Sequence, residues 1–373
     1  MKKVNAQKLF FPAASIYAAM AVLLSVFALH AGWPRGLIAT GHGHEMFFGF
    51  TLALIAGYNL GKITQRLLLA LFVLWLAARI SYLLAPSHLI SQWLSPLFAL
   101  FLAWHIVPRF FAAKKWRNKV ISPLLLIICL LPALWLLQQQ MSLTIEHRQL
   151  VSATLLLLIL LMAFFGGRMI APTTAGELQK QGIRLQTPVQ PRLEALILLL
   201  LPLGALSILV PSTKQLAGVP TFLAACVLMV RLVRWQVWRC PNRPDLFGLA
   251  VGYLWLALGT SGLSLAFWFK LPVDTILHMI TVGAIGCLSA SLMLKSRFKR
   301  SSTEPRPMVA SLSIISLISL ATILRVIATA DTFSQLLLWL SAVSWALAFI
   351  RLGFLLLSDA NNPSRLTTWR QAI

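Results

Sequence analysis

Two histidine motifs carry the residue types best suited to chemistry in this sequence. His42, His44 and Glu45 lie in a His-Gly-His-Glu-Met run that opens one apolar segment, and His278 lies just inside another. Imidazole is costly to place in a bilayer and is a good ligand of iron and copper, so these histidines indicate a metal or haem site. We predict that His42, His44 and His278 are metal ligands, and that His44 and His278 reach a common cofactor.

Carboxylates adjoin both motifs. Asp274 precedes His278 by one helical turn, so its carboxylate can accept the second N–H of that imidazole, as the partners of metal-ligating histidines usually do. Glu45 follows His44 directly and is assigned the same supporting role. Gly283 and Gly286 remove side chains below His278, which would let another helix or a flat macrocycle approach.

The spacing of His42 and His44 leaves two arrangements open. On a helix, residues two apart point to opposite sides. In an extended lead-in, which Gly41 and Gly43 favour, both imidazoles can face the same way.

Two arginines, Arg79 and Arg325, also fall within apolar segments, near the same face of the membrane. Each would suit a haem propionate or another carboxylate. The alternatives are that they pair with each other, with Asp331 or with helix-end carbonyls. Other histidines near the membrane surface are interpreted as capping or interfacial groups.

The elements that must position these residues are membrane-spanning helices. Of the 373 residues, 59% are hydrophobic and only 11% are charged, far from the roughly one-quarter typical of soluble domains. The sequence predicts an all-α, polytopic membrane protein with about twelve transmembrane helices. These spans are expected near residues 10–30, 44–61, 67–84, 90–107, 120–137, 149–166, 193–210, 216–236, 246–269, 272–294, 308–328 and 333–357.

The net charge of +23 follows the membrane topology. With every span crossing once, most lysines and arginines fall on one side, and the other side carries Arg35, Arg148, Lys214 and Lys270. This bias predicts that both termini are cytosolic, and it explains the charge without nucleic-acid binding. No segment is polar enough to form a soluble domain, so residues 1–373 are expected to be one integral-membrane domain in the lipid bilayer.

Several motifs, in this order, resemble the NnrS family of bacterial inner-membrane proteins. They are Leu9-Phe10-Phe11-Pro12, the run from His42 to Phe50, Trp75-Leu76-Ala77-Ala78-Arg79, Gly166-Gly167-Arg168-Met169-Ile170, the run from Gly252 to Gly259, and the run from His278 to Gly286. The resemblance spans most of the chain. It implies a twelve-helix, multi-pass protein of the bacterial inner membrane that contains haem and copper and takes part in nitric oxide metabolism or protection against nitrosative stress.

The chain is a divergent member on this comparison. The family usually has a histidine just before Gly252-Tyr253, where this chain has Ala250-Val251, and the Gly-His-Thr-Gly-Arg element after the tenth helix is replaced by residues 296–300.

The first functional hypothesis is therefore a haem b protein, with or without copper, that has nitric oxide as its ligand. The absence of a Cys-x-x-Cys-His motif excludes covalent, c-type attachment. His44, His278, Arg79 and Arg168 are the cofactor-binding candidates. Whether nitric oxide is turned over or only bound is left open. The alternative is a metal-free transporter or permease that uses Arg79, Arg325 and Asp274 as substrate or proton groups.

Overall fold

The computed structural model describes residues 2–38, 40–114, 116–141, 145–185, 188–271, 273–298, 308–328 and 334–358. Its N-terminal half comprises β1 (Lys3–Asn5), α1 (Gln7–Ala31), η1 (Arg35–Leu37), α2 (Thr40–His44), η2 (Glu45–Thr51), α3 (Leu52–Asn59), β2 (Lys62–Thr64), α4 (Gln65–Leu84), α5 (Leu89–Phe111), α6 (Trp116–Lys119), α7 (Ile121–Gln140) and α8 (His147–Lys180). The remaining elements are α9 (Pro191–Leu209), η3 (Pro211–Thr213), α10 (Gly218–Arg234), η4 (Val237–Arg239), α11 (Pro244–Phe269), α12 (Val273–His278), η5 (Met279–Ala284), α13 (Ile285–Phe298), α14 (Met308–Ile327) and α15 (Ser334–Leu357).

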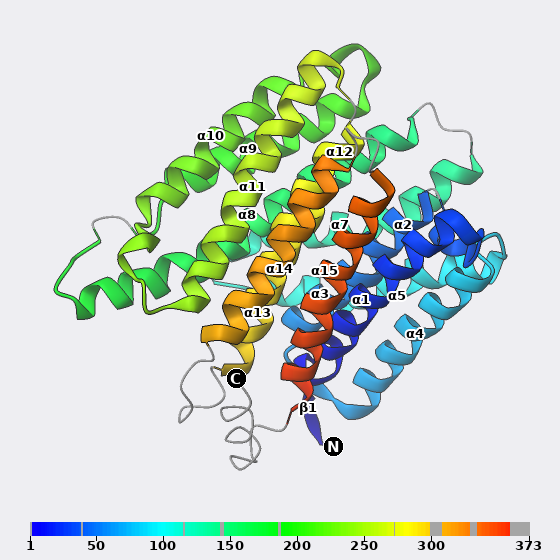
Figure 1. Ribbon diagram of the computed structural model, residues 1–373, viewed down its shortest axis with the longest axis horizontal. Helices are drawn as coiled ribbons and strands as arrows, with labels where there is room; N and C mark the ends of the chain where they lie inside the picture. Colours follow the sequence, from blue (N-terminus) through cyan, green and yellow to red (C-terminus); the bar gives the residue numbers. More distant parts are fainter. Residues whose placement is uncertain are drawn as a thin grey trace.

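The predicted all-α, polytopic fold is confirmed. In the described ranges, 11 helices are long and apolar enough to cross a membrane. The continuous helical run of α2, η2 and α3, from Thr40 to Asn59, is about 30 Å long at 1.5 Å per residue and matches the hydrocarbon thickness. Because α1 begins and α15 ends at the same end of the bundle (Figure 1), the number of crossings is even, and we count this run as the twelfth.

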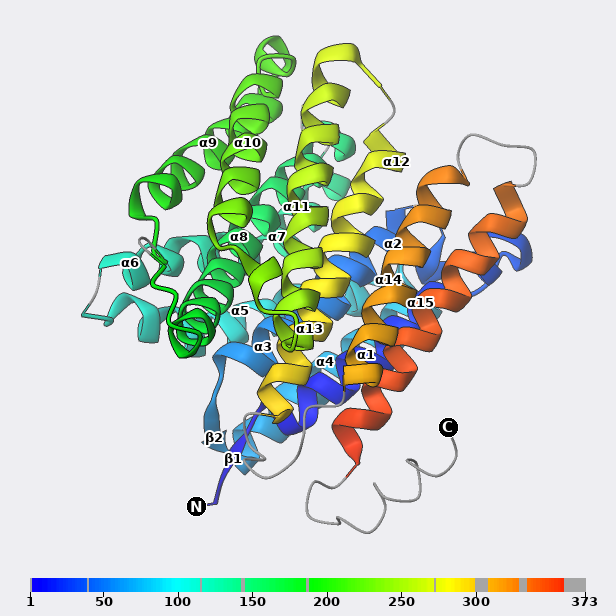
Figure 2. The ribbon, with the colours of Figure 1, turned by 60° about the vertical axis from the view of Figure 1, so that its left-hand side comes forward.

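The two ends of the bundle differ. Strands β1 and β2 pair antiparallel at one end, called here the β1 end, and η1, α2 and α12 lie at the other, the α12 end (Figures 1 and 2). The charge bias predicts that the β1 end is cytosolic. At that end Arg243 donates to Glu177 and Asp245, at 2.7 and 2.9 Å, and so ties α8 to the start of α11.

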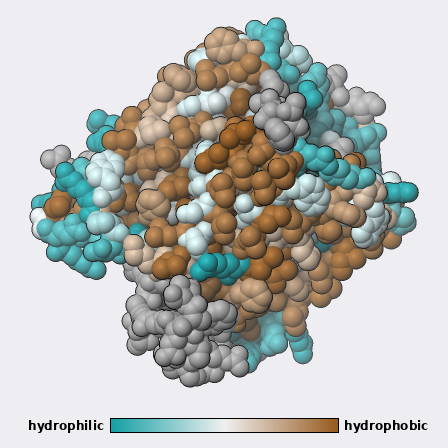
Figure 3. Space-filling model, viewed as in Figure 1, coloured by the Kyte–Doolittle hydropathy of each residue, from teal (hydrophilic) through white to brown (hydrophobic). Residues whose placement is uncertain are grey.

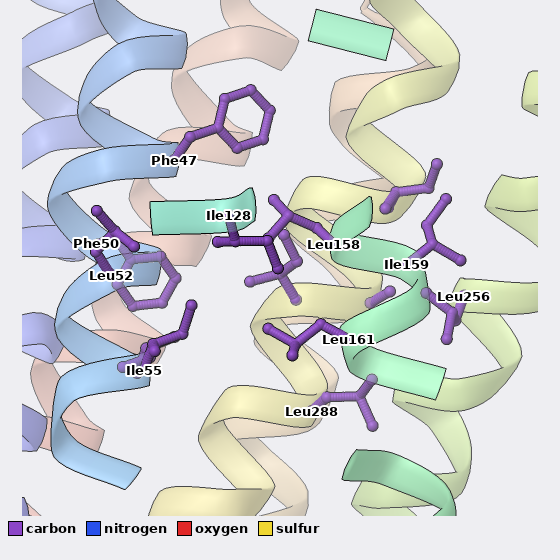
Figure 4. Packing of buried hydrophobic residues seen from close by; sticks show 14 of the residues in the cluster. Phe47, Phe50, Leu52, Ile55, Ile128, Leu158, Ile159, Leu161, Leu256 and Leu288 are labelled. Atoms are coloured by element: carbon purple, nitrogen blue, oxygen red, sulfur yellow. The ribbon is translucent and has the colours of Figure 1, made fainter. Parts of the chain in front are cut away.

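One large apolar core runs through the bundle. Side chains from several helices interdigitate in it, among them Phe47, Ile128, Leu158 and Leu288 (Figure 4). The outer surface is also apolar (Figure 3), and helices α4, α9 and α15 leave large hydrophobic residues exposed on it. An outside as apolar as the inside is the pattern of a bundle surrounded by lipid.

Two predicted boundaries were wrong. Helix α8 continues through Pro172 to Lys180, beyond the expected end of that span near residue 166. Helix α2 begins at Thr40, before the expected start of that span at residue 44, and of the two arrangements left open for His42 and His44 the structure shows the helical one.

The glycine before His42 lies in a close contact at this helix start. A Cβ at Gly41 would lie 2.2 Å from the carbonyl oxygen of Gly36, and a Cβ at Gly36 would lie 2.0 Å from that of Tyr82. These glycines therefore let α2, η1 and α4 approach closely, while the backbone of α2 stays helical.

Candidate functional site

Each histidine motif is followed at once by a π-helix. Segment η2 begins at Glu45, directly after His44, and η5 begins at Met279, directly after His278. In a π-helix the backbone bonds run from i to i+5, and such segments occur frequently at functional sites. The two motifs thus share a local structure although they lie in different halves of the chain.

Helix α2 directs its two histidines to different places. His42 lies on the wall of a cavity of about 1220 Å³ at the α12 end, and His278 lies on the wall of the same cavity. His42 and His278 are close enough to interact electrostatically with each other and with Arg325 of α14. His44 is buried elsewhere, stacked on Tyr82 with 3.9 Å between ring centroids. The structure therefore brings His42, and not His44, to the cavity wall on which His278 lies.

Hydrogen bonds indicate which nitrogen of each cavity histidine is protonated. The hydroxyl of Ser25 donates to the carbonyl of Ala21, so Nδ1–H of His42 must donate to Ser25 Oγ, at 2.7 Å. Nδ1 of His278 lies 2.6 Å from the backbone carbonyl of Asp274, which can only accept. Both rings therefore present an unprotonated Nε2, the form of imidazole that binds a metal.

The supporting contact predicted for Asp274 is made by a different group. The backbone carbonyl of Asp274, not its carboxylate, accepts from His278. The carboxylate instead faces Arg148 at 3.7 Å, and both side chains are largely exposed. An intrahelical carbonyl four residues earlier is always present on a helix, so the i, i+4 spacing could not distinguish the two acceptors.

The cavity combines apolar walls with a few polar groups. Phe47, Phe50, Trp135 and Trp345 supply aromatic surface from three parts of the chain. The charged residues on the walls are Arg148, Lys214, Lys270, Arg325 and Asp274. Since Arg148 and Lys270 are exposed to solvent, the cavity reaches the surface at the α12 end. A large, mostly apolar pocket with few convergent polar groups is the usual form of a cofactor or ligand site.

A second polar cluster lies outside the cavity wall, within electrostatic range of His42 through Glu45. Glu45, fully buried, accepts from Arg79 Nη1 at 2.7 Å, from His44 Nδ1 at 3.0 Å and from the hydroxyl of Tyr17. Arg79, only 1% exposed, also donates to Ser95. The predicted contact between Glu45 and His44 is thus present, but Arg79 is occupied inside the cluster and does not line the cavity, so it is not placed to hold a propionate there.

The remaining candidates also have other partners. Arg168 of α8 places its guanidinium carbon 3.8 Å from the centre of the Phe164 ring and is absent from the cavity wall. The space at Gly283 and Gly286 is filled by Trp255 and Trp345, whose ring atoms would lie 2.7 Å from an added Cβ. That space is taken by neighbouring helices and not left for a macrocycle.

Several residues of the site carried no signal in the sequence. Ser25, Trp135 and Trp345 reach the cavity from α1, α7 and α15, and Tyr17 and Ser95 complete the buried cluster. Each is an ordinary residue of an apolar helix until the packing of distant helices is known. Among the described residues, no three histidine, cysteine, aspartate or glutamate side chains are grouped to hold a metal ion, so His42, His44 and His278 do not form one site.

Fold and site together define a multi-pass membrane protein with an internal cavity that presents two imidazoles. The chain belongs to the NnrS family, since the family model described as NnrS protein matches residues 6–357. Neither a curated protein nor a solved structure matches it.

Proposed function

We propose that this chain is a haem b protein of the bacterial inner membrane that binds nitric oxide, with His42 and His278 as the candidate residues that would hold the iron. The observation that carries the proposal is the pair of imidazoles on one cavity wall, each with Nδ1–H donated and Nε2 free. Family membership supports the choice of cofactor and of nitric oxide.

The residues of the cavity fit a haem. Its volume of about 1220 Å³ exceeds the roughly 300–1000 Å³ of common ligand pockets and leaves room for a macrocycle. Aromatic rings offer flat apolar contact, and cationic side chains are available for two carboxylates. When bound, the iron would supply a site for nitric oxide at a position that one of the two imidazoles does not hold. The chain's own residues hold the two rings in one tautomer, exclude bulk water from the apolar walls and place cations toward the α12 end.

The same residues do not fit a copper site made by protein side chains alone. Within the described ranges, no third histidine, cysteine or carboxylate is grouped with His42 and His278. We therefore propose haem without copper for this cavity.

An absorption spectrum of protein purified from haem-replete cells tests the proposal. We expect a Soret band that shifts when nitric oxide is added to the reduced protein. His42→Ala and His278→Ala should each greatly reduce the haem content. A matched control is His105→Ala, because His105 makes the same Nδ1 contact with a backbone carbonyl four residues earlier, at 2.8 Å, but lies outside the cavity.

Two outcomes would contradict this proposal. A wild-type protein without a Soret band would return the chain to the metal-free transporter hypothesis. Haem retained by both cavity variants and lost by His44→Ala would move the site to the buried cluster. Nitric oxide consumption by membranes, measured with an electrode against membranes lacking the protein, separates turnover from binding.

A further inference from the structure

The basic residues expected on the non-cytosolic side all lie at cavities. Arg148, Lys214 and Lys270 line the large cavity. Arg35 lines a neighbouring cavity of about 580 Å³, which shares Thr40 with the first. The few basic residues on this side of the membrane are thus grouped around the two cavities.

Acidic groups balance only part of this charge. Asp274 faces Arg148 and Glu146 faces Lys214, both at 3.7 Å and both in exposed pairs, which bind weakly. Within the described ranges, no carboxylate lies within ion-pair distance of Lys270 or Arg325, and Asp274, which pairs with Arg148, attracts the Arg325 guanidinium only from a longer distance. The cavity therefore keeps an excess of positive charge, and apolar walls strengthen the resulting field.

Among these cations, Arg325 is the one that interacts electrostatically with both His42 and His278. It is half-buried on the cavity wall, and the described residues offer its guanidinium no hydrogen bond. A guanidinium presents parallel N–H donors that match a planar group with two oxygens. Each imidazole presents Nε2 as an acceptor, but within the described ranges no hydrogen bond joins Arg325 to either ring, so the guanidinium keeps donors for a further group.

We propose that Arg325 binds a planar anionic group with two oxygens, of the carboxylate or nitrite type, which enters through the basic mouth at the α12 end. The site deepens the proposed function, since it lies in the same cavity as the two histidines, but it needs no iron. Two sources present this chemistry: a carboxylate of the bound macrocycle, and a free small anion from the adjoining aqueous compartment.

Cysteine accessibility in the haem-free protein tests the site. Thr281 lines the cavity one turn beyond His278, and none of the native cysteines does, so Thr281→Cys places a reporter thiol there and the parent chain gives the background rate. A negatively charged methanethiosulfonate should modify this thiol about tenfold faster than a positively charged one at low salt. The preference should weaken as salt is added. Formate or nitrite should slow the modification.

Arg325→Gln, combined with the reporter, should abolish protection by formate and nitrite. Arg148→Gln is the matched control: it also removes a cavity cation, but one paired with Asp274 at the exposed mouth, so it should reduce the rate preference and keep the protection. Equal rates for the two reagents, or protection that survives Arg325→Gln, would overturn the proposal.

Porphyrin binding distinguishes the two sources. Metal-free protoporphyrin that binds at least about tenfold more tightly than its dimethyl ester, with the difference lost in Arg325→Gln, assigns the site to the carboxylate of the macrocycle. Equal binding of acid and ester, with formate protection intact, assigns it to a free anion. If neither result is obtained, the anion site at Arg325 is overturned. The absence of a haem spectrum in the wild type bears on the proposed function alone.

Discussion

Removing the positive partner of the buried Glu45 should destabilise the protein strongly. Glu45 is fully buried and Arg79 is 1% exposed, with 2.7 Å between the nearest charged atoms. In Arg79→Met, the carboxylate would keep the Tyr17 hydroxyl and the His44 N–H but lose its counter-charge. Removing one partner of a buried ion pair typically costs about 3–5 kcal/mol, because the other charge stays in a medium that solvates it poorly.

A second substitution should recover much of this loss. In Glu45→Gln combined with Arg79→Met, no charge is buried, and the amide oxygen can still accept from Tyr17 or His44. We expect the double variant to be about 2–3 kcal/mol more stable than Arg79→Met alone, within the range of coupling energies between contacting residues. Glu45→Gln alone should also be destabilised, since it leaves the guanidinium unpaired.

Denaturant-induced unfolding in detergent micelles, followed by tryptophan fluorescence, gives the free energies for this cycle. Arg148→Met is the control, because its exposed pair with Asp274 at 3.7 Å should contribute less than about 1 kcal/mol. The reasoning fails in either of two cases: Arg79→Met costs no more than Arg148→Met, or the double variant is less stable than Arg79→Met.

Three further predictions concern packing, ligand support and topology. Gly41→Ala should destabilise the protein by about 1–3 kcal/mol in the same assay, because its Cβ would meet the Gly36 carbonyl oxygen at 2.2 Å. The control Gly43→Ala should be neutral or stabilising, because its Cβ would lie 3.8 Å from Trp135. Equal effects of the two substitutions would contradict the tight contact at Gly41. Asp274→Asn should leave the haem spectrum of the bound protein unchanged, since a backbone carbonyl supports His278; a clear spectral shift would show that the carboxylate acts. Cysteine labelling in intact cells should reach residues 31–38 from outside and residues 109–114 only after permeabilisation; labelling of both from one side would refute the orientation.

The membrane fold was predictable because it depends on composition and length. Apolar runs of about 20 residues can be stable in a bilayer only as helices, since each backbone group must bond within its own segment. The same argument places His42, His44 and His278 near one end of the bundle, which the structure shows.

The partners of those histidines were not predictable. Whether His42 or His44 faces His278 depends on the rotation of α2, and that rotation is fixed by the contact of Gly41 with Gly36 and of Gly36 with Tyr82. These contacts join residues from separate elements and leave no periodic pattern in the sequence. Arg79 shows the same limit: its type and depth indicated an anionic partner, but only the packing of α4 against η2 identifies Glu45 as that partner.

A spacing that occurs twice in the sequence corresponds to the same local structure in both places. The spacing His-x4-Gly occurs at His44 and Gly49 and again at His278 and Gly283, and each glycine lies within the π-helix that follows its histidine. A Cβ at Gly49 would lie 2.8 Å from Arg79 and Tyr17, and one at Gly283 would lie 2.7 Å from Trp255. Side chains of neighbouring helices therefore press against both π-helices at the same position.

This shared arrangement gives a physical reason for the two interruptions. A π-helix has poorer backbone geometry than an α-helix and persists where packing favours it. Each segment faces two environments, the cavity on one side and packed side chains on the other. In the first segment this leaves His44 with Glu45 in the buried cluster while Phe47 and Phe50 line the cavity. In the second it leaves His278 and Thr281 on the cavity wall while Gly283 is packed by Trp255. Each short segment thus serves both the packed core and the cavity.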